Sequence, residues 1–145
     1  PYIRQETVKP YGVTLVSKDE LLECSDFISM HLLLNEDTRK SINADFFKKM
    51  KKSAIFINTG RGGLVDEEAL IEALRTGEIA GAGLDVLTAE GIDRDAPLQK
   101  FDNVIITPHA AWYSEEAFNT LLTSAAQEVV RALHGEPVKN QVNKF

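Results

Sequence analysis

Three side chains suited to acid chemistry each follow an apolar segment of the sequence, and they are Arg61, Glu90 and His109. The planar guanidinium of Arg61 can bind a carboxylate through paired, charge-assisted hydrogen bonds. An imidazole in general titrates near neutral pH, so a histidine such as His109 can pass a proton to or from an oxygen atom. A carboxylate such as Glu90 beside the ring orients it and favours its protonated form. The three residue types therefore suit proton transfer at an oxygen of a small molecule that carries a carboxylate.

The segments that precede these side chains are predicted to be strands of one parallel sheet. They are the runs Ala54–Asn58, Ile79–Val86 and Asn103–Thr107. Short β-rich runs alternate here with amphipathic helical patterns, which is typical of a parallel sheet covered by helices. Open sheets of this kind bind ligands outside the carboxyl ends of their strands. We therefore expect the three side chains to meet at one rim of the sheet.

Each of these residues also has an ordinary interpretation when it is taken alone. Arg61 lies between glycines and can be a surface arginine in a turn, and Glu90 can be a solvated side chain in a polar loop. His109 follows a proline and can simply cap its loop. Asp85, inside an apolar strand, is harder to explain in this way, because an unpaired buried carboxylate is costly. Asp85 can bind a cofactor amide or a hydroxyl. Because polar side chains follow three strand ends that converge, a functional site is favoured over the separate ordinary interpretations.

The remaining pattern is also that of an α/β protein. Two further strands are predicted at Val13–Val16 and Asp26–Leu32. Gly77 and Gly135 are placed to end two helices, as glycine does in a left-handed conformation. The side chains expected to cap the first turns of helices are Ser17, Asn43, Asp66 and Ser114. The predicted fold class is α/β, with a Rossmann-type parallel sheet and flanking helices.

The glycine-rich turn that binds a dinucleotide pyrophosphate, G-x-G-x-x-G with an acidic residue about 20 positions later, appears nowhere in the sequence. Gly81 and Gly83 imitate its first two glycines, but they lie within a predicted strand. We therefore predict an incomplete sheet that lacks its first two strands and this turn. In the usual strand order 3-2-1-4-5-6 the absent strands include the central one. An exposed interior edge and oligomerisation, or pairing with the absent half, are expected.

Net charge, apolar runs and cysteine content indicate which classes of protein the chain can belong to. The chain has 145 residues and a net charge of −6, which argues against a nucleic-acid surface. No apolar run approaches the roughly 18 residues of a membrane span, and the N-terminal residues lack the layout of a signal peptide. The single cysteine, Cys24, excludes an intrachain disulfide and is expected to be a buried structural thiol. A cytoplasmic protein without membrane or direct nucleic-acid partners is predicted.

Three runs of sequence resemble signatures of the D-isomer-specific 2-hydroxyacid dehydrogenases. They are Ile57–Glu67, Gly81–Val86 and Thr107-Pro108-His109, and the similarity extends over essentially the whole chain. The segment from His109 to Glu115 is most similar to the C-terminal-binding-protein branch, which includes NAD(H)-dependent corepressors and phosphoglycerate dehydrogenase-like bacterial proteins. Gly91 stands where the family usually has a proline after its glutamate.

The resemblance implies separate roles for the site residues. Arg61 would bind the carboxylate and carbonyl of the substrate, His109 would be the general acid/base, and Glu90 would be its hydrogen-bonded partner. Asp85 would hold the nicotinamide carboxamide of NAD. Trp112 would face the substrate, or alternatively anchor the long C-terminal helix. The other cofactor contacts that the resemblance implies, beside Arg61 and His109 themselves, are Leu32, Leu33, Asn35, Thr38, Thr59, Gly60 and Ala111. No metal ion is expected in this site.

Taken together, residues 1–145 are interpreted as the C-terminal portion of an NAD-binding domain, with the substrate domain absent. The reaction implied is reversible hydride transfer between nicotinamide and C2 of a D-2-hydroxy or 2-oxo acid. Two alternatives are an NADH-sensing, corepressor-like binding module and a catalytically inactive fragment. The isolated chain is expected to have little or no activity. A homo-oligomer is also expected, with the region Asn103–Ser124 contributing to its interface.

Overall fold

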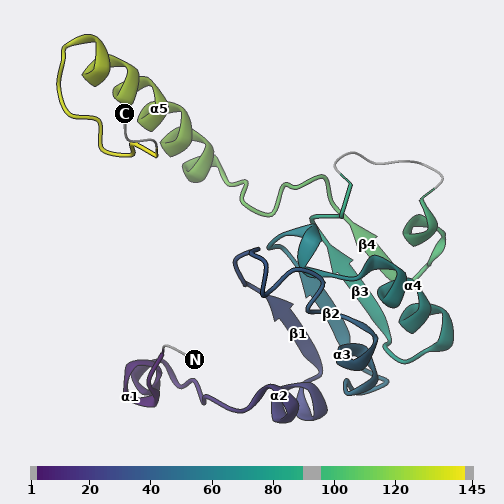
Figure 1. The fold of residues 1–145 in the computed structure, drawn as a ribbon. Coiled ribbons are helices and arrows are strands. Elements are labelled where there is room, and N and C mark those ends of the chain that lie inside the picture. Colours follow the sequence, from purple (N-terminus) through teal and green to yellow (C-terminus); the bar gives the residue numbers. More distant parts are fainter. Residues whose placement is uncertain (1–2, 90–95, 143–145) are drawn as a thin grey trace. The chain divides into compact units, whose positions relative to one another are not determined.

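In the computed structural model four parallel strands form one sheet (Figure 1). Helices pack against one face of this sheet. The structure describes residues 3–89 and 96–142. The chain divides into two units, Pro1–His109 and Ala110–Phe145. The helices and strands are, in chain order, α1 (Gln5–Val8), η1 (Lys9–Tyr11), α2 (Lys18–Cys24), β1 (Phe27–Met30), α3 (Ala44–Lys48), β2 (Ile55–Asn58), η2 (Gly62–Leu64), α4 (Glu67–Thr76), β3 (Gly81–Leu84), η3 (Pro97–Lys100), β4 (Val104–Ile106) and α5 (Glu115–Leu133).

The strands of the sheet have the order β1-β2-β3-β4, and every neighbouring pair is parallel. The predicted α/β fold class with a parallel sheet is therefore confirmed, although each strand is shorter than its apolar run. The last residues of the four strands, Met30, Asn58, Leu84 and Ile106, are paired in register. The loops that follow the strands consequently start from one level of the sheet.

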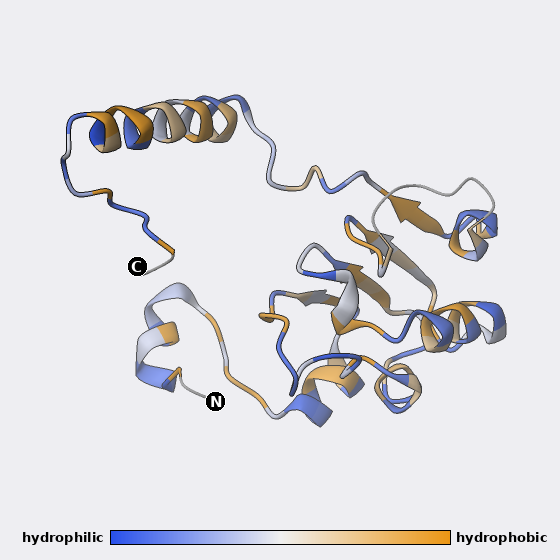
Figure 2. Ribbon diagram, turned by 45° about the horizontal axis from the view of Figure 1, so that its top comes forward, coloured by the Kyte–Doolittle hydropathy of each residue, from blue (hydrophilic) through white to orange (hydrophobic). Residues whose placement is uncertain are grey.

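The core lies between the sheet and the helices α2, α3 and α4. Alternate strand residues such as Ile28, Phe56 and Ala82 face this layer and are buried, since side chains of a strand alternate between its faces. Phe46 and Phe47 of α3 each meet the Phe56 ring edge-on, at centroid distances of 6.1 and 5.4 Å. Figure 2 shows the strands as a largely hydrophobic block. These packed rings hold β2 in the centre of the sheet.

The opposite face of the sheet is much more open. Phe27 of β1 is 66% exposed and Ile105 of β4 is 71% exposed. Ile55 and Ile57 of β2, which share this face, are half-buried. The described part of the unit Pro1–His109 therefore packs its helices as one layer against a sheet with one apolar face uncovered.

Local signals place most helix ends correctly. The side chains of Ser17, Asn43 and Ser114 accept hydrogen bonds from the backbone N–H three residues on, as predicted for capping residues. Gly77 ends α4 in a left-handed conformation with φ of 71°. Asp66 was also predicted to cap a helix, and the side-chain hydrogen bond expected of a capping residue is absent. Asp66 occupies the N-cap position of α4, but its side chain makes no capping bond and lies 3.9 Å from the ammonium of Lys40.

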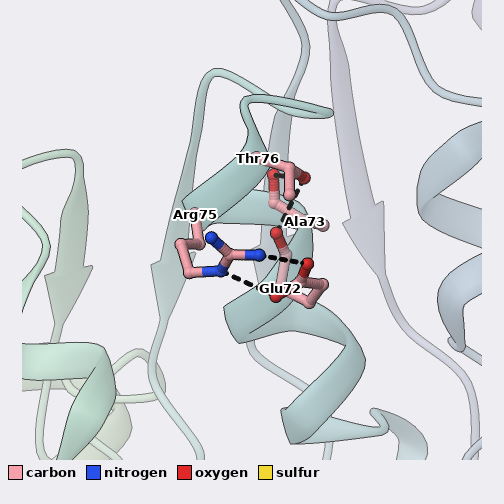
Figure 3. Close-up of polar contacts among 4 residues, drawn as sticks. All are labelled: Glu72, Ala73, Arg75 and Thr76. Carbon is pink, nitrogen blue, oxygen red and sulfur yellow. Dashed lines mark hydrogen bonds and ion pairs between the residues drawn. The ribbon is translucent and has the colours of Figure 1, made fainter.

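The last turn of α4 is closed by side chains of the helix itself (Figure 3). Arg75 donates two hydrogen bonds to the carboxylate of Glu72, of 2.8 and 2.6 Å, and Thr76 donates to the Glu72 carbonyl at 2.8 Å. The hydrogen bond from Arg75 is the largest cause that lowers the pKa of Glu72. These contacts are on the exposed face of the helix, so they shape its end more than they stabilise the core.

The segment Val13–Val16 was predicted to be a strand, and this prediction is wrong. No strand includes these residues, and the side chain of Gln5 binds their backbone instead. Its amide donates to the Val13 carbonyl at 3.1 Å and accepts from the Leu15 N–H at 2.9 Å. These hydrogen bonds to a side chain take the place of ladder bonds to a strand, so the β-propensity of the segment is not expressed among the described residues.

Cys24 was predicted to be a buried thiol, and this prediction is also wrong. Cys24 is the last residue of α2 and is exposed. The apolar face of that helix is centred on Leu22, which is fully buried. Cys24 lies two positions further on, about 200° around the helix, so it points away from the core.

The unit Ala110–Phe145 consists mainly of α5, which Figure 2 shows carrying both hydrophobic and hydrophilic residues along its length. Within this helix no residue is buried, and large apolar side chains such as Leu121, Val129 and Leu133 are exposed. The three-to-four spacing correctly predicted a helix here. In the parts of the chain that the structure describes, no helix is long and apolar enough to cross a membrane.

Candidate active site

The backbone ladder of the sheet continues for one residue beyond β3 and β4. The N–H of Asp85 donates to the carbonyl of Asn58 at 2.9 Å, and the N–H of Thr107 donates to the carbonyl of Leu84 at 2.9 Å. The loops after β2, β3 and β4 are therefore fixed to one another as they leave the sheet. This places the start of each polar loop at the same rim, as the strand ends predicted.

The loop that carries Arg61 is packed with very little clearance. A Cβ atom added to Gly62 would lie 2.0 Å from the carbonyl oxygen of Leu87 in the loop after β3. A Cβ atom on Gly63 would lie 2.9 Å from the side chain of Leu34. The guanidinium of Arg61 is exposed and donates to the neighbouring Gly60 carbonyl at 2.7 Å. Glycine is required at 62 because the backbones of two loops touch there.

Asp85 is the first residue after β3 and is 5% exposed. The hydroxyl of Thr107 donates a short hydrogen bond to its carboxylate. The backbone carbonyl of Asp85 accepts from the N–H of His109 at 2.9 Å. Asp85 therefore joins the loops after β3 and β4 and offers a negative charge at the rim.

His109 has a left-handed backbone, with φ of 53°. Its N–H donates to the carbonyls of both Asp85 and Thr107, at 2.9 and 3.0 Å, and these bonds hold the backbone in this conformation. Left-handed residues other than glycine are uncommon and cost on the order of 1 kcal/mol, and they cluster at functional sites. The direction in which the exposed imidazole leaves the loop is thus set by the chain around it.

A cavity of about 510 Å³ lies at this rim, and Arg61, Asp85 and His109 all line it. Its volume is within the range of small-molecule sites in proteins. The apolar part of its wall is formed by Leu34, Val86, Leu87, Ile106 and Pro108. A positive side chain, a buried carboxylate and an imidazole therefore share one concave site that three strand ends build. Arg61 and His109 come together as the sequence predicted.

The loop after β1, which is predicted to line the cofactor, contributes Leu34 to this cavity. Asn35 and Thr38 bind each other, through the Asn35 N–H and Thr38 hydroxyl at 2.8 Å and the Thr38 N–H and Asn35 side chain at 2.9 Å. The Thr38 hydroxyl also donates to the Leu33 carbonyl at 2.7 Å. These side chains shape the loop, and Leu34 is its residue at the cavity. The other predicted cofactor residues of this unit that do not line the cavity are Leu32, Leu33, Thr59 and Gly60.

The remaining predicted site residues are Glu90, Ala111 and Trp112. Glu90 is outside the described residues. Ala111 and Trp112 belong to the unit Ala110–Phe145, in which the Trp112 ring packs against Tyr113 at a centroid distance of 5.7 Å. Tyr113 in turn packs against Phe118 of α5 at 5.8 Å. This chain of rings agrees with the interpretation of Trp112 as an aromatic that anchors the helix.

Sequence reasoning missed two polar residues of the site, Asn58 and Thr107. Thr107 binds the Asp85 carboxylate, and Asn58 binds the loop that carries Arg61. The available signal was position, since each is a polar residue at the end of an apolar strand, where parallel sheets place their ligands. Asparagine is also a common turn residue, so its residue type gave no indication that Asn58 is buried.

The sequence is similar to a known protein family and to several characterised proteins. Residues 1–111 match the family model described as D-isomer specific 2-hydroxyacid dehydrogenase, NAD binding domain. A glyoxylate reductase of Korarchaeum cryptofilum is 43% identical over 141 residues, which cover 97% of this chain and 42% of that protein. A D-3-phosphoglycerate dehydrogenase of Archaeoglobus fulgidus is 41% identical over 143 residues, covering 99% of this chain and 27% of that protein.

Solved structures lead to the same family. A D-lactate dehydrogenase from Lactobacillus jensenii, solved with NAD⁺, has a TM-score of 0.85 and 35% sequence identity, and the match covers 99% of this chain. It covers 47% of the chain of that enzyme. The chain thus spans less than half the length of each of these relatives.

Proposed function

The chain belongs to the family of D-isomer-specific 2-hydroxyacid dehydrogenases, as its motifs predicted, and we propose that it forms the catalytic end of an NAD-dependent oxidoreductase in this family. The substrate class would be a small D-2-hydroxy acid or the matching 2-oxo acid. The observation that carries this proposal is the single cavity lined by Arg61, Asp85 and His109. Each residue offers one of the interactions that the reaction needs.

The rim residues fit the nicotinamide end of NAD. A carboxamide offers N–H donors, and Asp85 presents a carboxylate that is 5% exposed and lines the cavity. This carboxylate, next to the Thr107 hydroxyl, would accept hydrogen bonds from those donors. Val86, Ile106 and Pro108 supply apolar surface suited to a flat ring. When NAD is bound, it supplies or accepts the hydride, and the protein binds and orients the two reactants.

The chain's own residues would handle the acid and its proton. The Arg61 guanidinium would hold the substrate carboxylate through two parallel hydrogen bonds, which fixes the direction of C2. In reduction, protonated His109 would donate a proton to the C2 oxygen, and in oxidation its neutral ring would remove the hydroxyl proton. Glu90 would accept from the other ring nitrogen and favour the protonated form.

Replacing Arg61 by lysine tests this proposal in a longer protein that carries these residues. Lysine keeps the positive charge but loses the planar fork, so the acid would be held in the wrong orientation. We expect kcat/KM for glyoxylate, pyruvate or hydroxypyruvate to fall about 100-fold, measured by NADH absorbance. Arg75→Lys is the matched control, because Arg75 lies exposed on α4 and pairs with Glu72. Equal rates for the two variants, or no consumption of any 2-oxo acid by the parent, would refute the proposal.

The 145-residue chain by itself is expected to show little or no turnover of these acids with NADH. Its sequence contains no G-x-G-x-x-G turn, and that turn provides the contacts to the cofactor pyrophosphate. The measurement is NADH consumption by the purified chain against a protein-free blank. Robust turnover would show that the residues present are sufficient for cofactor binding.

A further inference from the structure

Asn58 and Asp85 are the buried polar or charged residues among those that the structure describes. Asp85 lines the cavity, and its burial is accounted for by the proposed contact with a cofactor. Asn58 is fully buried, with a relative exposure of 0%, at the last position of β2. Burying an amide without hydrogen bonds costs roughly 1–3 kcal/mol, so a fully buried asparagine in an apolar core needs specific partners.

Both polar atoms of the Asn58 side chain bind the loop that carries Arg61. The Oδ1 atom accepts from the Gly60 N–H at 3.0 Å, and the Nδ2 group donates to the Arg61 carbonyl at 3.0 Å. The partners also determine the orientation of the amide, because a backbone N–H needs an acceptor and a carbonyl needs a donor. One side chain therefore spans the loop from within and fixes it at two successive residues.

The backbone of Asn58 connects this loop to the rest of the site. Its carbonyl accepts from the Asp85 N–H at 2.9 Å. Thus the residue whose side chain holds the Arg61 loop also holds, through its main chain, the start of the loop that carries Asp85. Few other side chains can do this. Aspartate lacks the donor for the Arg61 carbonyl, leucine has neither group, and glutamine is longer by one methylene in a fully packed position.

We propose that Asn58 is a positioning residue for Arg61, which sets the place of the guanidinium by hydrogen bonds to both sides of its loop. The proposal rests on the substrate-binding role proposed for Arg61, but it is tested without substrate. A purely structural Asn58 would stabilise the fold through packing alone. In that case, removing the hydrogen bonds of Asn58 would make the Arg61 loop no more mobile than a core substitution that lowers the stability of the fold by a similar amount.

The test compares Asn58→Leu with Phe56→Leu by ¹⁵N relaxation of the 145-residue chain. Asn58→Leu keeps the size of the side chain and removes both hydrogen bonds. Phe56→Leu destabilises the same strand on the same face without touching the loop. In the parent chain and in Phe56→Leu, the backbone order parameters of Gly60 and Arg61 should be near 0.85, as in a rigid backbone. In Asn58→Leu they should fall below about 0.6.

Two outcomes would overturn the proposal: an ordered loop in Asn58→Leu, or equal loosening in both variants. A measurement on the unmodified chain keeps the proposal testable if Asn58→Leu does not fold. The Nδ2 protons of Asn58 should exchange with solvent at least about tenfold more slowly than those of the exposed Asn119. Equal exchange rates would also overturn it. Because neither measurement uses substrate, a failed Arg61→Lys result would reject the enzyme function and leave the positioning result intact.

Discussion

Gly62→Ala is expected to destabilise the chain by about 3 kcal/mol or more, because a new Cβ atom has no room between two backbones. It would lie 2.0 Å from the carbonyl oxygen of Leu87, 2.1 Å from its carbonyl carbon and 2.6 Å from the N–H nitrogen of Thr88. All three are backbone atoms, so relief requires the loop after β3 to move as a unit. That movement would break the contact between the loops that carry Arg61 and Asp85.

Gly83→Ala is the matched control for this prediction. Gly83 lies in β3 itself, and the nearest atom to an added Cβ is a side-chain carbon of Ile57 at 3.9 Å, an ordinary contact. Thermal unfolding followed by circular dichroism should show a fall in Tm of about 10 °C for Gly62→Ala and little change for Gly83→Ala. Similar Tm values for the two variants would mean that the loops separate easily, and that the close contact at Gly62 is not a requirement of the fold.

The second large effect is expected at His109. In a longer protein that carries these residues, His109→Asn should lower kcat by about 10²–10⁴-fold, the usual contribution of a general acid/base. Asparagine is the informative replacement because it tolerates the left-handed backbone that His109 adopts, with φ of 53°. The variant therefore removes the imidazole and keeps the loop. NADH affinity should remain mostly intact, measured by fluorescence titration.

Two further variants sharpen this test. His109→Ala should lose as much activity as His109→Asn, since both variants lack the imidazole that would donate and accept the proton. His134→Ala should keep full activity, because His134 is exposed at the end of α5 and pairs only loosely with Glu136, at 3.8 Å. If His109→Asn retained turnover, the ring would be dispensable and the proton would have to come from another group.

The sequence predicted the elements of the fold well because the relevant signals are local. Ser17, Asn43 and Ser114 cap helices through backbone groups three residues away, so a short stretch of sequence contains the whole interaction. The rim of polar residues was also predictable, since the carboxyl ends of parallel strands always share one edge. The expected meeting of Arg61 and His109 in one cavity needed no knowledge of side-chain packing.

The contacts that the sequence did not predict join segments that are distant in the chain. Gly62 is placed against Leu87, and Asp85 receives the hydroxyl of Thr107. Periodicity and capping rules describe neighbours within a few residues, so they carry no information on such pairs. Asn35 and Thr38, which the family resemblance assigns to the cofactor, bind each other through their polar atoms and shape their loop. Their contact with a cofactor stays a prediction.

The two hydrogen bonds of Gln5 connect α1 to the segment that follows η1. The Gln5 side chain binds the backbone of Val13 and Leu15, eight and ten residues further along the chain. Each such bond contributes on the order of 1 kcal/mol. A single amide therefore closes a loop of the chain at the N-terminal end of the described residues, in a place where the backbone of Val13–Val16 pairs with no strand.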